Sequence, residues 1–138
     1  DGRSFSEQAF HEMCERCHGA AWNISKQTPK FEVANGTIRF LNYFSNYECS
    51  VCEWWKLTED MREILRGAAH FETENYHTFP PGVSELLDGK SITVDFIDWP
   101  GGEKIRSLKM FKNGRVDLKF SSGELAGEFV HKYLGTMC

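Results

Sequence analysis

The stretch IRSLKMFKNGRVDLKF, residues 105–120, has two runs of alternating apolar and polar residues joined at Asn113 and Gly114. This pattern predicts a β-hairpin in which each strand buries one face. A two-residue turn would divide the apolar residues between the two faces of the hairpin. A three-residue loop with Gly114 in the left-handed conformation pairs Met110 with Val116 and gathers the apolar side chains on one face. The sequence therefore predicts a bulged turn.

The segment behind this hairpin predicts a helix. Ser121 and Glu124 have the spacing of a capping box, and Gly135 is suited to the end of a helix. Between these signals, apolar residues recur at helical spacing: Leu125, Phe129, Val130, Tyr133 and Leu134.

A strand and a short helix are predicted ahead of the hairpin. Ile92, Val94 and Phe96 alternate with polar residues, which is typical of a strand, and this strand is expected to end at Trp99. The region before it favours one helical turn that ends at Leu87.

A second Asn-Gly pair, at positions 35 and 36, predicts another hairpin over residues 31–44. With a type I′ turn, Val33 lies opposite Ile38 and Phe31 lies opposite Phe40. All of these apolar side chains then share one face, so the turn and the hydrophobic pattern agree.

Two further helices are predicted in the first half of the chain. Residues 6–17 carry one apolar stripe, and Gly19 is suited to its end; the stripe consists of Ala9, Phe10, Met13, Cys14 and Cys17. A second helix is expected to begin after Thr58 as its N-cap. Its buried side is expected to consist of Met61, Ile64, Leu65 and Ala68.

The order of the elements, α-ββ-α-βββ-α, predicts an α+β fold with helices on one face of a mainly antiparallel sheet. The length of 138 residues predicts a single domain, residues 1–138. Within it, residues 1–56 form a half that bears the cysteines. Residues 91–138 form a half made of the closing hairpin and its helix.

The composition excludes several classes of protein. The chain is 41% apolar and 26% charged, which is typical of a globular protein. Its net charge of −4 predicts no general attraction to nucleic acid or to anionic membranes. The sequence contains no apolar run long enough to span a bilayer and no signal peptide, so a cytoplasmic location and no membrane partner are expected.

The cysteine pairs carry the clearest chemical signal. Cys14 and Cys17 form one C-x-x-C couplet, and Cys49 and Cys52 form another. Thiolates are preferred ligands of zinc, and Cys₄ sites are usually closed and structural. The four residues predict a structural zinc site that fastens the first helix to the turn after the first hairpin.

Other interpretations of these cysteines remain open. Cys14 and Cys17 are also compatible with small buried apolar residues. Cys14 to His18 has the spacing of a c-type haem attachment motif, although haem leaves the second couplet without a role. His70, Glu72, Glu74 and His77 form the one other metal or acid–base candidate, and their spacing matches no metal motif. No catalytic motif is present in the sequence, so an enzyme is not predicted.

Aromatic and basic residues provide candidates for binding. Trp54 and Trp55 could stack on bases, anchor a protein partner or fill the core. The closing hairpin is locally basic and is the surface most suited to phosphate. Its cations are Lys104, Arg106, Lys109, Lys112, Arg115 and Lys119, and the last four are the binding candidates. Charge on such a hairpin also protects an edge from aggregation.

Residues 105–114 and 116–120, with the helix up to Leu134, resemble the closing segment of an uncharacterised domain family. That family is found in phage and plasmid proteins, sometimes fused to DNA methyltransferases. The matching features are the Phe-Lys-Asn-Gly turn, the alternating strand and the amphipathic helix. Where the family tends to have Asn and His in the outgoing strand, this chain has Arg115 and Asp117.

The resemblance implies a setting among mobile genetic elements. Small acidic proteins from that setting often inhibit host defence complexes by direct contact, and anti-CRISPR proteins are among them. The sequence therefore predicts a non-enzymatic binding protein whose partner is a host nucleic-acid-processing complex. The alternative is a zinc-stabilised accessory module that binds nucleic acid through the basic hairpin and the tryptophans.

Overall fold

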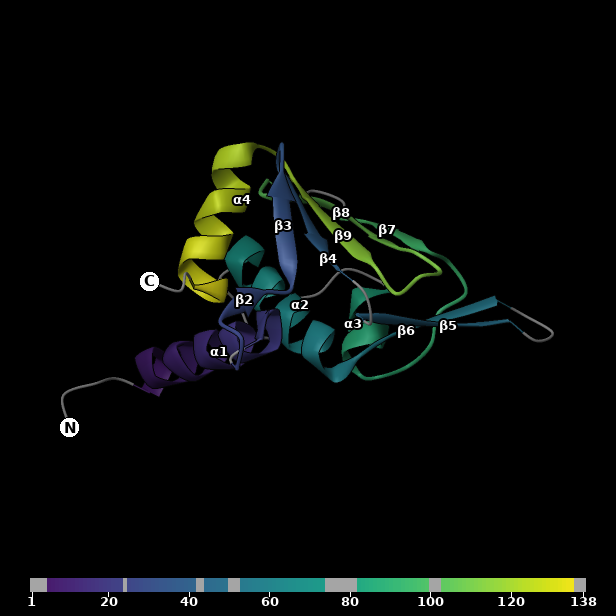
Figure 1. Cartoon of the computed structure of the whole chain (residues 1–138), viewed down its shortest axis with the longest axis horizontal. Helices are drawn as coiled ribbons and strands as arrows, with labels where there is room; N and C mark the ends of the chain where they lie inside the picture. Colours follow the sequence, from purple (N-terminus) through teal and green to yellow (C-terminus); the bar gives the residue numbers. More distant parts are fainter. Residues whose placement is uncertain are drawn as a thin grey trace.

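The computed structural model describes residues 5–23, 25–41, 44–49, 53–73, 82–99 and 103–135. Figure 1 shows the elements that these residues form. In chain order they are α1 (Phe5–Ala21), β1 (Trp22–Asn23), β2 (Thr28–Pro29), β3 (Phe31–Ala34), β4 (Thr37–Phe40), β5 (Ser45–Cys49), β6 (Glu53–Leu57), α2 (Glu59–Thr73), α3 (Val83–Leu87), β7 (Phe96–Asp98), β8 (Ile105–Met110), β9 (Val116–Phe120), α4 (Gly123–Phe129) and the π-helical turn η1 (Val130–Leu134).

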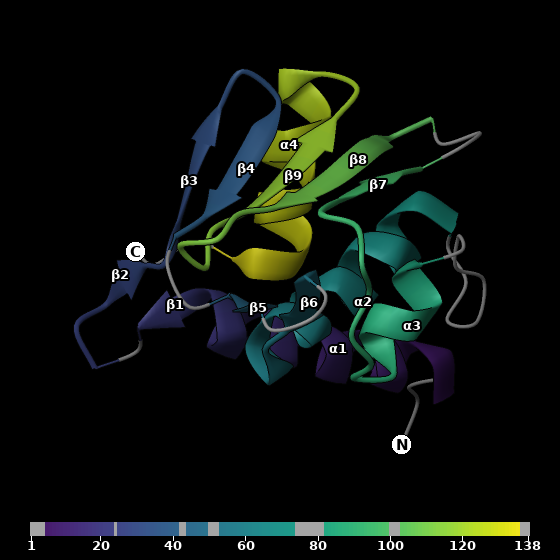
Figure 2. The same cartoon turned by 90° about the vertical axis from the view of Figure 1, so that its right-hand side faces the viewer.

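The largest sheet has five antiparallel strands in the order β3-β4-β9-β8-β7. Strands β4 and β9 join the two predicted hairpins, with Ile38 opposite Leu118. Helix α4 runs along one face of this sheet, and α1 and α2 lie below it (Figure 1). Figure 2 shows the opposite face, where none of the described helices lies in front of the strands. The predicted α+β class is confirmed.

The closing hairpin has the predicted register. Met110 pairs with Val116 and Leu108 pairs with Leu118. Gly114 has a φ of 90°, a left-handed conformation that a side chain would strain. The bulged turn is therefore confirmed.

The first hairpin also has the predicted register and turn. Val33 pairs with Ile38, and Phe31 pairs with Phe40. Asn35 has a φ of 50° and the following glycine has a φ of 86°, as a type I′ turn requires. The strands are shorter than predicted, because β4 ends at Phe40.

The predicted end of the first helix is wrong. Helix α1 continues through Gly19 to Ala21. Ala20 and Ala21 are buried in the core, and the glycine is exposed. Burial of these residues and of Trp22 outweighs the helix penalty of one glycine, which is about 1 kcal/mol.

The predicted strand over Ile92, Val94 and Phe96 is wrong in its position and in the side chains that it buries. Ile92 forms an isolated bridge with Trp55 of β6, and the regular strand β7 begins only at Phe96. Ile97 is buried in β7, whereas Phe96 is 46% exposed. The alternation of apolar residues along the sequence therefore does not follow one strand face.

The second helix and the closing helix begin as predicted, within one residue. The Thr58 hydroxyl accepts a hydrogen bond from the Met61 amide, which caps α2. Ser122, one residue after the predicted cap, accepts a hydrogen bond from the Leu125 amide. The last turn of the closing helix is π-helical and ends at Gly135. Among the described residues, no helix is long and apolar enough to cross a membrane.

Candidate binding surface

The uncovered face of the five-stranded sheet is the candidate site, and we call it the outer face. Cross-strand pairing brings one residue of each strand into a single row across this face. The row consists of Glu32, Arg39, Asp117, Lys109 and Phe96. Most of their neighbours along the strands point to the other face and are buried in the core, since side chains alternate along a strand, although Val33 is 45% exposed. The outer face therefore carries charged residues and the exposed aromatic ring of Phe96.

Ion pairs balance the charges of this first row. Arg115 Nε lies 3.2 Å from Asp117 Oδ1, and Lys109 Nζ lies 2.8 Å from Asp95 Oδ2. The hydrogen bond from Lys109 lowers the pKa of Asp95. Partial burial raises the pKa of Asp117, although Arg115 and Arg39 oppose this shift. The first row is consequently close to neutral.

A second row beside the first has an excess of positive charge. Lys119 pairs with Thr37 on one side and with Ser107 on the other. A β-bulge between Ile105 and Ser107 leaves Arg106 without a partner residue in β9, and its side chain is exposed. In the described part of the chain, no carboxylate forms an ion pair with Arg106 or Lys119.

A shallow hollow of about 410 Å³ connects these two cations to the aromatic ring of the first row. Its lining consists of Phe96, Asp98, Arg106, Ser107, Lys119, Phe120 and Ser121. Arg106 and Lys119 contribute two positive charges and Asp98 contributes one negative charge, so the described lining of the hollow has a net positive charge. Phe96 provides an exposed ring beside them.

The basic residues predicted for binding lie at two ends of the hairpin. Lys109 and Arg115 both lie over the ring of Phe111, and the Arg115 guanidinium is 4.0 Å from the ring centre. Lys112 Nζ, at the turn, is 5.0 Å from the centre of the Tyr47 ring. Lys119 is at the far end, in the hollow. The structure thus brings Lys109 and Arg115 together over one ring, and Lys112 lies over another. Lys119 joins Arg106, a further cation of the predicted basic hairpin, in the hollow described above.

The two predicted tryptophans point to opposite faces of β6. Trp54 is 38% exposed, and Trp55 is 5% exposed. The ring of Trp55 packs against Tyr47 with 4.9 Å between ring centres. Trp54 is therefore accessible to a partner, whereas Trp55 belongs to the core.

The cysteines of the first couplet differ in their surroundings. Cys17 is fully buried between α1 and α2, and its thiol donates a hydrogen bond to the Glu63 carbonyl at 3.3 Å. Burial raises the pKa of Cys17 to about 12, so the thiol is protonated at neutral pH. Cys14 is half-buried, and burial raises the pKa of its thiol as well.

The second couplet lies largely outside the described residues. Cys49 ends strand β5, but the placement of its side chain is not described, and Cys52 falls outside the described ranges. Within those ranges, no group of His, Cys, Asp or Glu is arranged to hold a metal. The zinc site therefore stays a prediction.

Because the Cys17 thiol is protonated in the folded state, we expect the free energy of unfolding to fall at alkaline pH. An exposed thiol has a pKa of about 9, so the unfolded state loses this proton before the folded state does. The unfolded state is then favoured as the pH rises. Between about pH 8 and about pH 10, the wild type should lose about 1 kcal/mol relative to a Cys17→Ala variant.

Urea denaturation of both proteins at the two pH values measures this difference. A zinc-bound thiolate predicts the opposite result, because the metal keeps the thiol deprotonated throughout this range. In that case the wild type should gain about 1 kcal/mol relative to the variant over the same pH range, and elemental analysis of the purified protein finds one zinc per chain. That pair of results would establish the zinc site and overturn the protonated thiol.

Glu72, considered above as part of an acid–base cluster, has a structural partner. Its carboxylate accepts hydrogen bonds from the backbone amides of Glu103, Lys104 and Ile105 at 2.6, 2.8 and 3.0 Å. It thereby fastens the start of β8 to the end of α2. His70 Nδ1 lies 2.8 Å from the Tyr133 hydroxyl. The other two members of the cluster, Glu74 and His77, lie outside the described residues.

No protein family model matches the chain, and neither a curated protein nor a solved structure shows significant similarity to it.

Proposed function

We propose that this chain is a small non-enzymatic binding protein that acts on a nucleic-acid-processing complex and contacts the nucleic acid through its outer face. The observation that carries the proposal is the hollow beside Phe96, where Arg106 and Lys119 are exposed and form no ion pair with a described carboxylate. In this proposal Arg106, Lys119 and Phe96 bind the nucleic acid and catalyse no reaction.

Single-stranded nucleic acid is the form that fits this surface best. A cation beside an exposed aromatic ring can hold a phosphate while a base stacks on the ring, and such stacking contributes about 1–3 kcal/mol per base. The hollow is open and shallow, which suits an unpaired strand. The chain has a net charge of −4 overall, so attraction to a polyanion depends on a local group of cations such as this one.

Direct contact with a protein subunit is the second candidate. It follows from the resemblance to mobile-element proteins, and exposed apolar side chains favour it. Trp54 is 38% exposed and Val94 is 54% exposed. Exposed aromatic residues are common anchors of protein interfaces.

Fluorescence anisotropy with labelled single-stranded and double-stranded oligonucleotides tests the first candidate. A variant with Arg106→Glu and Lys119→Glu should bind a single strand at least about tenfold more weakly at about 50 mM salt. The slope of log affinity against log salt should fall by about 2, one unit for each lost phosphate contact. Lys26→Glu is the matched control, since Lys26 is an exposed lysine in the turn between β1 and β2.

Equal affinity of the double variant and the control would contradict the assignment to the outer face. Absence of binding by the wild type at low salt would exclude nucleic acid altogether. The second candidate would then be examined by co-purification with a host nuclease complex, and a Trp54→Ala variant should lose that association.

A further inference from the structure

A second hollow, of about 380 Å³, lies between the helices on the covered side of the sheet. Helices α1 and α2 and the π-helical turn η1 each contribute to it, together with the residue before β8. Its lining consists of Phe10, His70, Phe71, Lys104, Lys132 and Tyr133. We propose that this hollow, which we call the helix pocket, binds a small organic anion with an aromatic body.

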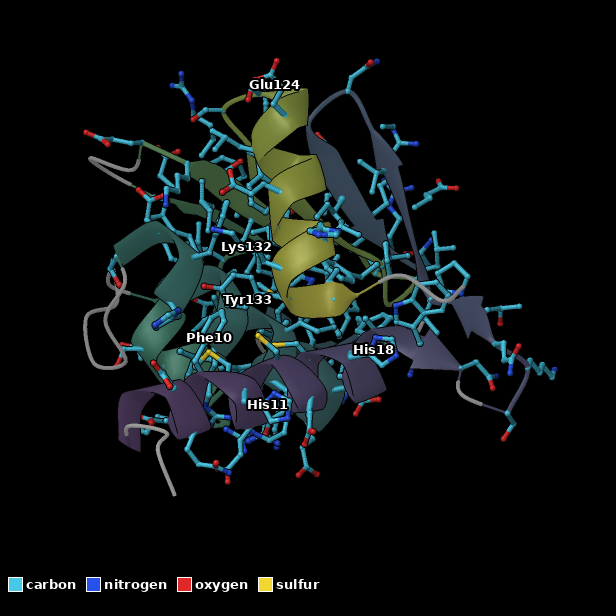
Figure 3. The ribbon with its side chains drawn as sticks, turned by 90° about the vertical axis from the view of Figure 1, so that its left-hand side faces the viewer. Phe10, His11, His18, Glu124, Lys132 and Tyr133 are labelled. Atoms are coloured by element: carbon cyan, nitrogen blue, oxygen red, sulfur yellow. The ribbon has the colours of Figure 1, made fainter. Side chains whose placement is uncertain are left out.

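The apolar part of the helix pocket is a group of packed rings. Phe10 meets Tyr133 edge-to-face, with ring centres 5.4 Å apart and an interplanar angle of 83°. Phe71 lies 5.8 Å from Tyr133, and His70 lies 5.4 Å from Phe10. Figure 3 shows Phe10 of α1 facing Tyr133 across the space between the two helices. Such walls favour a planar aromatic ligand, because rings pack edge-to-face or offset with one another.

The polar groups at this pocket are held in place by contacts of their own. His70 Nδ1 lies 2.8 Å from the Tyr133 hydroxyl, which fixes the orientation of both side chains. Lys104 Nζ donates to the Phe71 carbonyl at 3.0 Å and lies 4.7 Å from the centre of the Phe71 ring. Lys132 Nζ lies 3.1 Å from Glu128, one turn earlier on the exposed side of the helix.

The π-helical turn contributes two consecutive residues to the pocket. In η1 both Lys132 and Tyr133 line it, and π-helical turns are often found at functional sites. Side chains of His18 in α1 and of Trp22, which directly follows α1, anchor the end of this turn. The Leu134 carbonyl accepts a hydrogen bond from Trp22 Nε1 at 2.9 Å and another from His18 Nδ1 at 2.6 Å. These contacts hold the irregular backbone in place without help from a ligand.

The charge of the lining residues indicates whether the ligand is an anion or a cation. Two lysines line the helix pocket, and none of its described lining residues is acidic. Glu128 pairs with Lys132 from outside the pocket and offsets one of the two positive charges, so the balance stays positive. An anion is therefore favoured over a cation, and the partial enclosure by rings strengthens its interaction with Lys104 and Lys132. The volume of about 380 Å³ lies within the range of small-molecule sites, so a ligand of the size of an aryl carboxylate fits.

The test uses benzoate as the probe and its neutral analogue benzamide as the matched ligand. Aromatic ¹H–¹³C NMR spectra of the full chain are recorded during each titration. We expect saturable shifts of the ring signals of Phe10, His70 and Tyr133 with benzoate. Benzamide should bind at least about fivefold more weakly, because it lacks the charge.

Lys132→Glu is the informative variant, since Lys132 is exposed and its replacement leaves the core intact. It should weaken benzoate binding at least about fivefold, because a negative charge then replaces a cation beside the pocket. Lys90→Glu, an exposed lysine after α3, should leave binding unchanged. The proposal is overturned if the three rings show no saturable shift, if benzamide binds as well as benzoate, or if both variants bind equally.

Discussion

Replacing Phe129 by alanine should lower the free energy of unfolding by about 3–5 kcal/mol. Phe129 is 0% exposed and lies at the centre of an aromatic cluster that joins the closing helix to α2 and the sheet. Its ring centre is 5.6 Å from Phe71, 5.5 Å from Phe120 and 5.1 Å from Tyr133. These large neighbours are themselves packed against several elements, so they cannot collapse into the space that the ring leaves.

Urea denaturation followed by tryptophan fluorescence measures this loss. Glu128→Ala is the matched control, because Glu128 precedes Phe129 in the same helix and is exposed. Its ion pair with Lys132 is on the surface, so the control should change stability by less than about 0.5 kcal/mol. A loss below about 1 kcal/mol for Phe129→Ala would show that this helix does not pack as described.

Replacing Glu72 by alanine should lower the free energy of unfolding by about 3 kcal/mol. The carboxylate accepts hydrogen bonds from three consecutive backbone amides at the start of β8, and two of those amides belong to half-buried or buried residues, Lys104 and Ile105. Alanine leaves these donors without the acceptor that the fold provides. Hydrogen bonds to a charged acceptor each contribute about 1.5–3 kcal/mol, and partial exposure to water reduces the total.

Glu72→Gln separates this role from a role in acid–base chemistry. Glutamine keeps one side-chain oxygen as an acceptor, so about half of the loss should be restored in the same denaturation experiment. Thr73→Ala serves as the control: it removes the hydroxyl of an exposed residue, and because that hydroxyl donates to the Ala69 carbonyl at 2.9 Å, the cost should be about 1 kcal/mol or less. A Glu72→Ala variant as stable as the wild type would refute the anchoring role.

The two hairpins were predictable because their turns and their hydrophobic patterns constrain each other. At Asn113 and Gly114 only the bulged turn keeps the apolar residues together, and the structure has that register. The type I′ turn at Asn35 follows from the same reasoning. A slip of one residue would turn every side chain to the wrong face, so such patterns specify register strongly.

Other features depend on contacts that a sequence does not display. Helix α1 continues through Gly19 because Ala20 and Trp22 are buried by elements distant in the sequence. Ile92 pairs with β6, which interrupts the alternation that predicted a longer strand. The π-helical turn is stabilised where Leu134 meets side chains near the end of α1. Each case is a tertiary contact that overrides a local preference.

The candidate site was predictable only in part, for the same reason. The sequence indicated Lys109 and Lys119 as basic residues of the closing hairpin. It also indicated Arg106 there, but it did not indicate that Phe96 lies exposed beside this arginine, because that arrangement depends on a β-bulge and on the interrupted strand before β7. Which residues form a row across the sheet depends on how the strands pair. A single sequence does not show this pairing for strands that are far apart in the chain.

The most direct test of the central proposal is to map where a single-stranded oligonucleotide contacts the chain. Backbone amide NMR spectra are recorded as the oligonucleotide is added at low salt. If nucleic acid binds to the outer face, the largest shifts should occur at Ser107, Lys109 and Lys119, and the ring signals of Phe96 should also shift. Shifts that are absent, or that are largest on α1 or α2, would contradict it.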